Sequence, residues 1–585
     1  MSADWAKPRP IDIEFVKLTY ATPHKSRKRG TKQILKGVSG RFRSGELSAI
    51  LGPSGAGKTS LFHILTGFHR RNVTGEVRYL GTEGPIDFEE YRKTLRYIQQ
   101  DDKLYPSFTV IEAMHIAAEL KLGAHVSAAA KRAIIEDTLK TFDMTKVRDV
   151  RCDLLSGGQR KRLCIAVELV DNPGVVFLDE PTTGLDSLLS SECITTLKTL
   201  AADQRTVVCV IHQPSAAIFE AFDKVYFLAD GKCVYQGRPG ETVSYFRELG
   251  LCCPLYHNPA DYVTEVISNK LEFIEEPEFT EELVDQVDLG WIERRPVVAK
   301  HTKLFVFEFH KFTVLLKRCV VQLCRQWTDV QMKIGLNILL GILLGVMFRD
   351  AGNDASKTMD NIRFLISSSV FLSYTTLMPA VLRFPLELQV LQKEHFNNWY
   401  HLRTYFAAVS FIGIPYQVGL ALIYCSISYV LTGQLLDPMR FLLFCLVGVC
   451  TSLTAESIGL LFGSLFNPVN GTFFGAATLA AMLSLAGVIP LFQHMPAIMY
   501  NISYLSFLRY SVEGMAVAVY GFGREKLPCP DNLTYCHLRY PKKIMSEMCM
   551  DDSRYWTNIA ALLVNFIVIR ALSCFALKRR LSQPC

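Results

Sequence analysis

Charged and apolar positions are distributed very unevenly along this chain of 585 residues. Up to about Lys333 charges are frequent, but residues 404–436 and 457–508 contain no Asp, Glu, Lys or Arg. Uncharged segments of this length cannot form a soluble surface. The C-terminal part is therefore predicted to be a polytopic membrane domain, and the mixed N-terminal part a soluble one.

The apolar segments predict six membrane spans joined by short turns and two longer connections. In the first span only the 15 residues between Lys333 and Arg349 are uncharged, so the side chains of these two residues must reach toward the interfaces. An even number of spans returns the basic end "LKRRLSQPC" to the cytosolic side, as expected for Lys and Arg. We expect the spans at about 329–349, 362–382, 405–431, 441–465, 472–492 and 555–577.

Three regions follow from this division. Residues 1–265 form a soluble domain, 266–328 an acidic linker with a membrane-proximal connecting helix, and 329–585 the membrane domain. The start "MSADWAKPRPIDIEF" has no apolar run, so no secretory signal is expected and the first domain stays cytosolic. Its cysteines are expected to be reduced packing residues rather than metal ligands. A net charge of +7 is modest, and we expect no nucleic-acid binding.

The stretch "LSAILGPSGAGKTSLFHIL" reads as a buried strand, a glycine-rich loop and a helix start, which is the context of a P-loop. The glycines let backbone N–H groups face phosphates, and the helix adds the positive end of its dipole. Lys58 is expected to reach the β- and γ-phosphates, and Thr59 to place its hydroxyl on Mg²⁺. The ATP-binding residues predicted here are Gly52, Pro53, Ser54, Gly55, Ala56, Gly57, Lys58, Thr59 and Ser60.

Further polar residues follow other buried strands. In "VVFLDE", Asp179 is expected to bind Mg²⁺ and Glu180 to act as general base on the attacking water. His212 follows the strand in "TVVCVIHQPS" and is placed beside the γ-phosphate. Gln100 is the candidate that completes Mg²⁺ coordination and senses the neighbouring domain, and Gln99 remains an alternative.

A second phosphate-facing helix start, "LSGGQRKR", follows about a hundred residues after the P-loop. One P-loop does not need it, but it makes sense if it closes over the γ-phosphate held by another copy. This sequence resembles the signature motif of ATP-binding-cassette domains, and "GLDS" resembles the D-loop that crosses their dimer interface. The resemblance implies ATP contacts from Ser156, Gly157, Gly158, Gln159 and Asp186.

A cassette followed by a membrane domain resembles the G subfamily of ATP-binding-cassette half-transporters across almost the whole chain. "SGGQRKRL", "FPLE", "KEHFNNWY" and "ISYLSFLRYSVEGM" look closest to its sterol- and lipid-exporting branch. The expected fold class is an α/β P-loop ATP-binding-cassette domain followed by an all-α six-helix transmembrane domain. The resemblance implies a dimer with a central apolar cleft lined by Phe371, Tyr374, Thr375, Leu483 and Ala486, and an outward plug at Val488 and Ile489.

The two longer connections have different expected roles. Residues 383–406 fall on the cytosolic side as a polar, helix-compatible lever between ATPase and membrane bundle, with Glu394 near the middle. Residues 493–554 form an extracellular loop that permits disulfides. We favour a Cys529–Cys536 bridge, with Cys549 free or intermolecular, and glycosylation at Asn532.

Sequons at Asn72 and Asn470 fall in cytosolic positions and should be silent, and Asn501 lies close to the membrane. Glu456, inside the fourth span, should face a partner or a cavity, because a carboxylate there costs about 2.5–3.5 kcal/mol. We hypothesise that it makes a buried hydrogen bond and is protonated.

The leading function is ATP-driven export of sterols or other amphipathic lipids by a dimer, with ATP and Mg²⁺ as cofactors. The partners would be a second half-transporter chain, membrane lipids and a hydrophobic substrate. One alternative is a heterodimer subunit that transports small aromatic pigment precursors. Another is a transport-dead regulator, although Lys58, Asp179, Glu180 and His212 are all present. The sequence leaves open the plasma membrane or an internal vesicle membrane.

Overall fold

A computed structural model of the chain describes residues 8–23, 31–69, 72–254, 257–269, 308–487, 495–529 and 536–581. The chain divides into two compact units. The first comprises Met1–Val314 together with Lys393–His401, and the second Leu315–Gln392 and Leu402–Gln583. A nine-residue stretch from the predicted lever is thus part of the first unit. Most of the predicted acidic linker, residues 270–307, lies outside the described residues.

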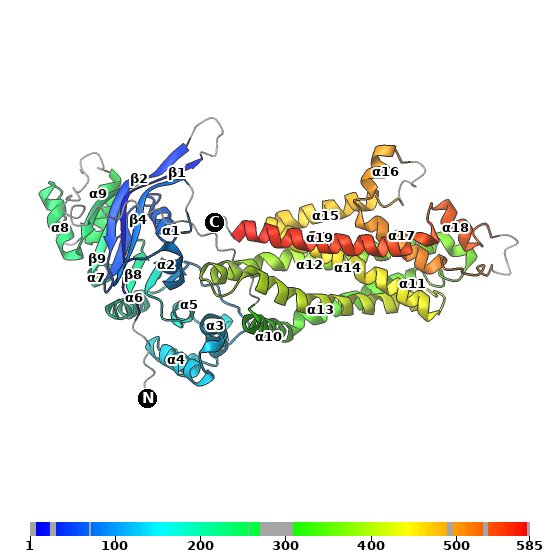
Figure 1. Ribbon diagram of the computed structural model, residues 1–585, viewed down its shortest axis with the longest axis horizontal. Coiled ribbons are helices and arrows are strands. Elements are labelled where there is room, and N and C mark those ends of the chain that lie inside the picture. The colour runs from blue at the N-terminus through cyan, green and yellow to red at the C-terminus, as the bar shows by residue number, and fades with distance from the viewer. Residues whose placement is uncertain are drawn as a thin grey trace. The chain divides into compact units, whose positions relative to one another are not determined.

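The first unit contains two β-sheets (Figure 1). The central sheet has the order β10-β9-β3-β8-β7-β6, and every pair in it is parallel except β10 with β9. Its strands β3, β7 and β8 are short apolar runs buried along almost their whole length, as parallel strands covered on both faces must be. The six strands are β3 (Leu47–Leu51), β6 (Leu95–Ile98), β7 (Val175–Asp179), β8 (Thr206–Val210), β9 (Lys224–Ala229) and β10 (Lys232–Gly237).

The second sheet is antiparallel and has the order β2-β1-β4-β5. Its strands are β1 (Ile11–Pro23), β2 (Thr31–Phe42), β4 (Val73–Gly81) and β5 (Gly84–Pro85). The helices of this unit are α1 (Lys58–Leu65), α2 (Phe88–Thr94), α3 (Val110–Leu122), α4 (Ala128–Thr141), α5 (Gly157–Leu169), α6 (Ser187–Ala202), α7 (Ala216–Ala221), α8 (Pro239–Glu248) and α9 (Pro259–Asn269).

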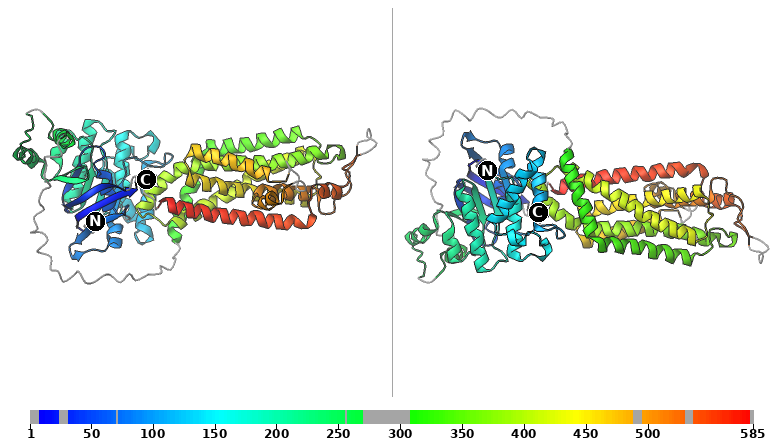
Figure 2. Two further views of the ribbon diagram at one scale, coloured as in Figure 1. Left: turned by 90° about the horizontal axis from the view of Figure 1, so that it is seen from above. Right: turned by 90° about the horizontal axis from the view of Figure 1, so that it is seen from below.

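The second unit is helical, and its long helices run alongside one another in both views of Figure 2. Helix α14 packs against α13, α15, α17 and α19, and α11 packs against α13. The helices are α10 (Phe309–Arg325), which begins in the first unit, α11 (Trp327–Met347), α12 (Thr358–Phe396), α13 (Leu402–Leu431), α14 (Pro438–Leu465), α15 (Pro468–Ser484), α16 (Ala497–Ser503), α17 (Phe507–Tyr520), α18 (Pro541–Glu547) and α19 (Tyr555–Leu581).

Among the described residues, five helices are long and apolar enough to cross a membrane: α11, α12, α13, α14 and α19. They correspond to the first, second, third, fourth and sixth predicted spans. The fifth corresponds to α15, which ends at Ser484 rather than near 492 and has 17 residues. At about 26 Å it is shorter than a hydrocarbon core of ~30 Å. Gly487 follows with a φ of +78°, which is not helical, so the helix does not continue.

Helix α12 extends beyond the predicted second span and runs without a break to Phe396, with Pro379 and Pro385 inside it. The extracellular loop predicted at 493–554 also differs from the structure, because it contains α16, α17 and α18. Every residue of α17 except the partly buried Tyr510 is buried. Its sequence "FLRYSVEGMAVAVY" is apolar and rich in small residues, and a β-carbon on Gly514 would lie 3.1 Å from Val447. The segment predicted as a loop therefore contains a helix that packs closely on α14.

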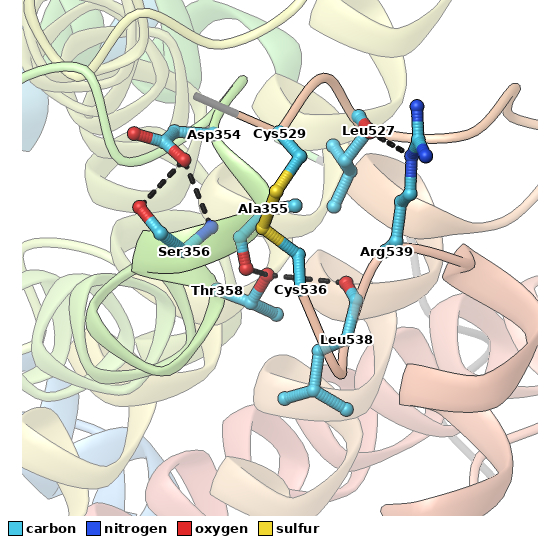
Figure 3. The surroundings of a disulfide bond; sticks show 9 residues. All are labelled: Asp354, Ala355, Ser356, Thr358, Leu527, Cys529, Cys536, Leu538 and Arg539. Atoms are coloured by element: carbon cyan, nitrogen blue, oxygen red, sulfur yellow. Dashed lines mark hydrogen bonds between the residues drawn. A yellow bond between two sulfur atoms is a disulfide. The ribbon is translucent and has the colours of Figure 1, made fainter. Parts of the chain in front are cut away.

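A disulfide joins Cys529 and Cys536, the pairing that the sequence favours, with their Cα atoms 6.2 Å apart (Figure 3). Hydrogen bonds hold the surrounding chain to the start of α12. Ala355 N–H donates to Pro528 O at 3.0 Å, and the Thr358 hydroxyl donates to Leu538 O at 3.4 Å. Cys549 carries a free thiol. Asn532 lies outside the described residues.

Glu456 meets a cationic partner within the second unit. Nη1 of Arg570 in α19 lies 3.4 Å from its Oε2, and both side chains are largely buried. Nη2 of Arg570 also donates to the Ser410 hydroxyl at 2.9 Å. The expected buried hydrogen bond is present, with Arg570 as its donor.

Breaking this pair from one side should destabilise the second unit more than removing both charges. Arg570→Gln leaves the Glu456 carboxylate buried without a cation, which costs on the order of 3–5 kcal/mol. In detergent or nanodiscs, Arg570→Gln should melt several degrees below wild type, and Glu456→Gln/Arg570→Gln should recover part of the loss. The exposed Arg579→Gln in the same helix serves as control. A double variant no more stable than Arg570→Gln would contradict the pairing.

Candidate functional site: a nucleotide site at one edge of the parallel sheet

Four neighbouring parallel strands bring the predicted site residues to one edge of the central sheet. In the order β3-β8-β7-β6, the chain leaves β3 into the glycine loop, β8 toward His212, β7 into Asp179 and Glu180, and β6 toward Gln100. Because parallel strands end on the same side, segments separated by up to about 150 residues in sequence become neighbours. Loops at the carboxyl edge of such a sheet are the usual place for ligands.

The glycine loop needs glycine at its first position. Gly52 has a φ of +142°, and a β-carbon there would lie 2.0 Å from the carbonyl oxygen of Leu228 in β9. Gly57, which caps α1, adopts a left-handed conformation with a φ of +103°. The backbone is therefore curved around the start of α1, where N–H groups attract anions.

Lys58 is only 7% exposed, and its ammonium donates to Gly52 O at 2.7 Å and Pro53 O at 2.9 Å. Burial lowers its pKa, and the nearby Glu180 and Asp179 oppose that shift. The cation thus lies inside the loop that it is predicted to serve, next to an exposed Thr59. A glycine-rich loop at a helix start, with one cation and one hydroxyl, suits a triphosphate.

The two carboxylates at the end of β7 have different surroundings. Burial raises the pKa of Asp179, and the adjacent Glu180 raises it further. Glu180 holds a backbone φ of +46°, which is uncommon for a residue with a side chain, and its N–H donates to Val210 O of β8 at 2.9 Å. Its Oε2 accepts from Gln100 at 2.7 Å and from Thr183 at 2.8 Å.

These contacts separate the two glutamine candidates. The Gln100 side chain is exposed and reaches Glu180, whereas Oε1 of Gln99 is buried. Gln100 is therefore the glutamine that the structure brings to the carboxylates. His212 lies two residues after β8 and is exposed. The oxygens of Thr59, Asp179 and Gln100 are the kind of ligand that Mg²⁺ prefers.

The second helix start is built as the sequence predicts. Ser156 caps α5 through a capping box with Gln159, with bonds of 3.3 and 3.1 Å. A β-carbon on Gly158 would lie 2.9 Å from Leu189, so glycine lets α6 approach closely. Asp186 caps α6 by accepting from Leu189 N at 2.8 Å. Ser156, Gly157 and Asp186 are all exposed in the single chain.

Residues Lys393–His401, here called the tip segment, pack into the first unit. Asn397 pairs with the backbone of Tyr97 in the edge strand β6: its Oδ1 accepts from Tyr97 N and its Nδ2 donates to Tyr97 O, both at 2.9 Å. Phe396 lies 5.3 Å from the Tyr97 ring. The guanidinium of Arg92 stacks 3.9 Å above the Phe396 ring and donates to its carbonyl at 2.6 Å.

A second group of contacts ties the tip segment to α5. Trp399 Nε1 donates to Oε2 of Glu168 at 3.2 Å, and Lys121 binds the same carboxylate oxygen at 2.8 Å. Glu168 is fully buried, and the ammonium of Lys121 balances its charge. The predicted lever residue Glu394 is also buried, and its carboxylate accepts from Tyr400 within the tip segment. The contacts with the sheet and α5 come from residues that sequence reasoning did not single out, although the quoted "KEHFNNWY" contains them.

The predicted cleft residues of the second unit are not equally accessible. Tyr374 is 52% exposed, and Phe371, Thr375 and Leu483 are partly buried. Ala486 differs from the prediction, because it is 1% exposed and packs in the helical core. Val488 and Ile489 lie outside the described residues.

Acid should destabilise the first unit because His63 becomes protonated. This residue belongs to α1, and its ring contacts the rings of Tyr97 and His69. Burial and the neighbouring His69 lower its pKa from 6.5 to about 4. The unfolded chain then binds a proton that the folded chain does not, so stability is retained above pH 6.5 and lost between pH 6.5 and 4. The full loss is roughly 3 kcal/mol.

The measurement is the melting temperature against pH for wild type and His63→Gln. The variant should lose less stability on acidification, and His125→Gln, at an exposed histidine, should follow wild type. Parallel curves for wild type and His63→Gln would contradict this assignment.

The site can now be compared with known proteins. Residues 35–183 match the ABC transporter family, and residues 212–304 and 310–520 each match an ABC-2 type transporter family. ABC transporter G family member 14 of Arabidopsis thaliana is 31% identical over 86% of this chain and 82% of its own length. ABC transporter G family member 1 of Dictyostelium discoideum is 26% identical over 97% of this chain and 85% of its own length.

The cassette match agrees with the geometry of the glycine loop, the β7 carboxylates and the α5 start, and it implies ATP binding and ATP hydrolysis coupled to transport. The helical match agrees with the apolar helices of the second unit. With one cassette joined to one membrane domain, and this identity to relatives over most of their length, the chain belongs to the ABC transporter G family as a half-transporter.

Proposed function

We propose that two half-transporter chains assemble and use ATP hydrolysis to export sterols or other amphipathic lipids across a membrane. The observation that carries the assembly is the exposed start of α5. Ser156 and Gly157 present a capped helix N-terminus to solvent, in addition to the phosphate-binding start of α1. Two phosphate-facing helix starts with one glycine loop fit an ATP held between the loop of one chain and α5 of another.

Different residues of the nucleotide site would bind the phosphates, hold Mg²⁺ and activate the attacking water. Lys58 would bind the β- and γ-phosphates, and Thr59, Asp179 and Gln100 would hold Mg²⁺. When bound, the cation neutralises charge on the phosphate oxygens. Glu180 would polarise the attacking water, and His212 would face the γ-phosphate from the end of β8. Asp186 would lie at the contact between the two cassettes.

The tip segment would carry the effect of ATP to the membrane domain. It packs against β6, three residues before Gln100, and against α5, which begins at the exposed signature. Both elements reach parts of the cassette that would rearrange when two cassettes close on ATP. Glu394 would support the segment from within through Tyr400.

The cargo proposal rests on the resemblance and on the residues of the expected cleft. Tyr374 presents a ring and a hydroxyl, and Phe371, Thr375 and Leu483 are partly accessible. Apolar surface with a few hydroxyls suits an amphipathic molecule such as a sterol. Ala486 is buried in the single chain and would contribute only after rearrangement.

The free thiol of Cys549 remains a candidate for an intermolecular bridge, and Asn532 for glycosylation.

The alternative with the most support is a heterodimer that transports small aromatic pigment precursors, because the same site would form with a different partner chain. A transport-dead regulator is disfavoured by the intact set Lys58, Asp179, Glu180 and His212. Whichever membrane holds the transporter, the cassette would lie on the cytosolic side.

ATPase measurements on the purified chain in lipid nanodiscs test the proposal. We expect Mg²⁺-dependent hydrolysis that rises with cholesterol and falls at least a hundredfold in Glu180→Gln, because general-base catalysis contributes about 10²–10⁴-fold. Activity indifferent to sterols would overturn the cargo proposal and leave the ATPase. Folded protein that binds ATP without hydrolysing it would favour an obligate partner chain.

A further inference from the structure

Tyr97 connects the tip segment with the nucleotide site through contacts at both of its ends. Its backbone is the part of β6 that Asn397 grips, through two hydrogen bonds of 2.9 Å. Strand β6 lies at one edge of the central sheet, so among the described residues its backbone has a strand on one side only. The amide of Asn397 satisfies the N–H and C=O on the open side as a further strand would, and it fixes the position of Tyr97 along that edge.

The side chain of Tyr97 points to the catalytic edge. Tyr97 pairs in register with Phe177 of β7, and Asp179 lies two residues further along the same strand. Side chains two residues apart lie on the same face of a sheet. The Tyr97 hydroxyl therefore reaches Asp179, to which it donates at 3.3 Å. Nε2 of His63 lies 3.4 Å from the same hydroxyl, and with pKa about 4 the imidazole is neutral and can donate to it.

We propose that Tyr97 is a positioning residue that orients Asp179 and transmits the position of the tip segment to the nucleotide site. A shift of Asn397 displaces the backbone of β6, and the hydroxyl of Tyr97 moves with it. Asp179 is then held or released as a ligand for Mg²⁺. This route is separate from Gln100, which reaches Glu180. It rests on the ATPase of the cassette and not on the cargo or on the identity of the partner chain.

The other contacts of the tip segment lead elsewhere, which makes the proposal specific. Arg92 belongs to α2. Its guanidinium donates to the carbonyl of Phe396, and its own carbonyl accepts from the side chain of Asn398. Trp399 bonds to Glu168 near the end of α5. Within the described part of the chain, neither Arg92 nor Glu168 bonds to a carboxylate of β7, whereas Tyr97 bonds to both Asn397 and Asp179. Trp399 therefore serves as a control within the tip segment, and Asn397 as the probe.

The first test measures binding without turnover, in full-length protein carrying Glu180→Gln. Melting temperature is recorded with saturating ATP while Mg²⁺ is titrated, which gives the Mg²⁺ concentration for half of the thermal shift. Tyr97→Phe keeps the ring and the backbone but removes the bond to Asp179. The half-saturating Mg²⁺ concentration should rise roughly tenfold, the scale of one hydrogen bond to a charged group.

The stabilisation by ATP in EDTA should be unchanged, because Lys58 and the glycine loop are intact. Tyr91→Phe is the matched control: it removes another buried tyrosine hydroxyl, which donates to Leu65 O at 3.0 Å, away from both carboxylates. If Tyr91→Phe and Tyr97→Phe shift the Mg²⁺ titration equally, or if neither shifts it, Tyr97 does not position Asp179.

The second test addresses transmission from the tip segment. Asn397 contacts none of the residues predicted to bind Mg²⁺. Asn397→Ala should nevertheless raise the half-saturating Mg²⁺ concentration by a factor of about three or more. Trp399→Phe loses its bond to Glu168. It should leave the half-saturating Mg²⁺ concentration unchanged even if it lowers the melting temperature. In Tyr97→Phe/Asn397→Ala the shift should match that of Tyr97→Phe alone, because both changes act through one hydroxyl.

The route through Tyr97 would be overturned if the shift in half-saturating Mg²⁺ concentration in the double variant were the product of the two single shifts. It would also be overturned if Asn397→Ala left that concentration unchanged. Asn397→Asp keeps the acceptor for Tyr97 N and loses the donor to Tyr97 O, so it should fall between wild type and Asn397→Ala. This variant keeps the test informative if the alanine variant does not fold. All of these titrations measure binding, so a transporter with no lipid cargo gives the same result.

Discussion

The register of four parallel strands is the constraint on which the nucleotide site depends. Strands β3, β8, β7 and β6 come from distant parts of the sequence, and only their hydrogen-bonded order brings their carboxyl ends to one edge. Gly52 permits this arrangement, because any β-carbon there would meet the backbone of β9. The lysine, the carboxylates and the glutamine then face one loop without further adjustment. The same edge strand β6 contacts the tip segment, so under the proposed mechanism the sheet would serve both catalysis and communication.

The second unit is organised around α14, which packs against α12, α13, α15, α17 and α19. Small residues permit this: a β-carbon on Gly459 would lie 2.6 Å from Leu377 O of α12, and one on Gly448 equally close to Cys425 of α13. Close backbone approach through glycine is how apolar helices pack where lipid offers no hydrophobic driving force. Arg570 and Glu456 add a polar link between α14 and α19.

Features encoded locally could be predicted from the sequence, and features made by tertiary contact could not. The glycine loop, the β7 carboxylates and the α5 capping box each occupy a few consecutive residues. Asn397 was missed because its partner lies 300 residues away, and an asparagine in a polar connection carries no local signal. Arg570 as the partner of Glu456 was missed for the same reason. Helix α17 was assigned to the extracellular loop, and its packing against α14, from a different part of the sequence, carries no local signal.

Complementation between two inactive variants tests most directly whether the nucleotide site is shared by two chains. Lys58→Ala removes the phosphate-binding cation, and Gly157→Asp places a charge at the start of α5. A mixed dimer of the two contains one intact site, made from the glycine loop of one chain and the α5 start of the other. Each variant alone should be inactive, and mixed dimers isolated by two affinity tags should recover ATPase activity. Inactive mixed dimers, or full activity in either variant alone, would contradict the account.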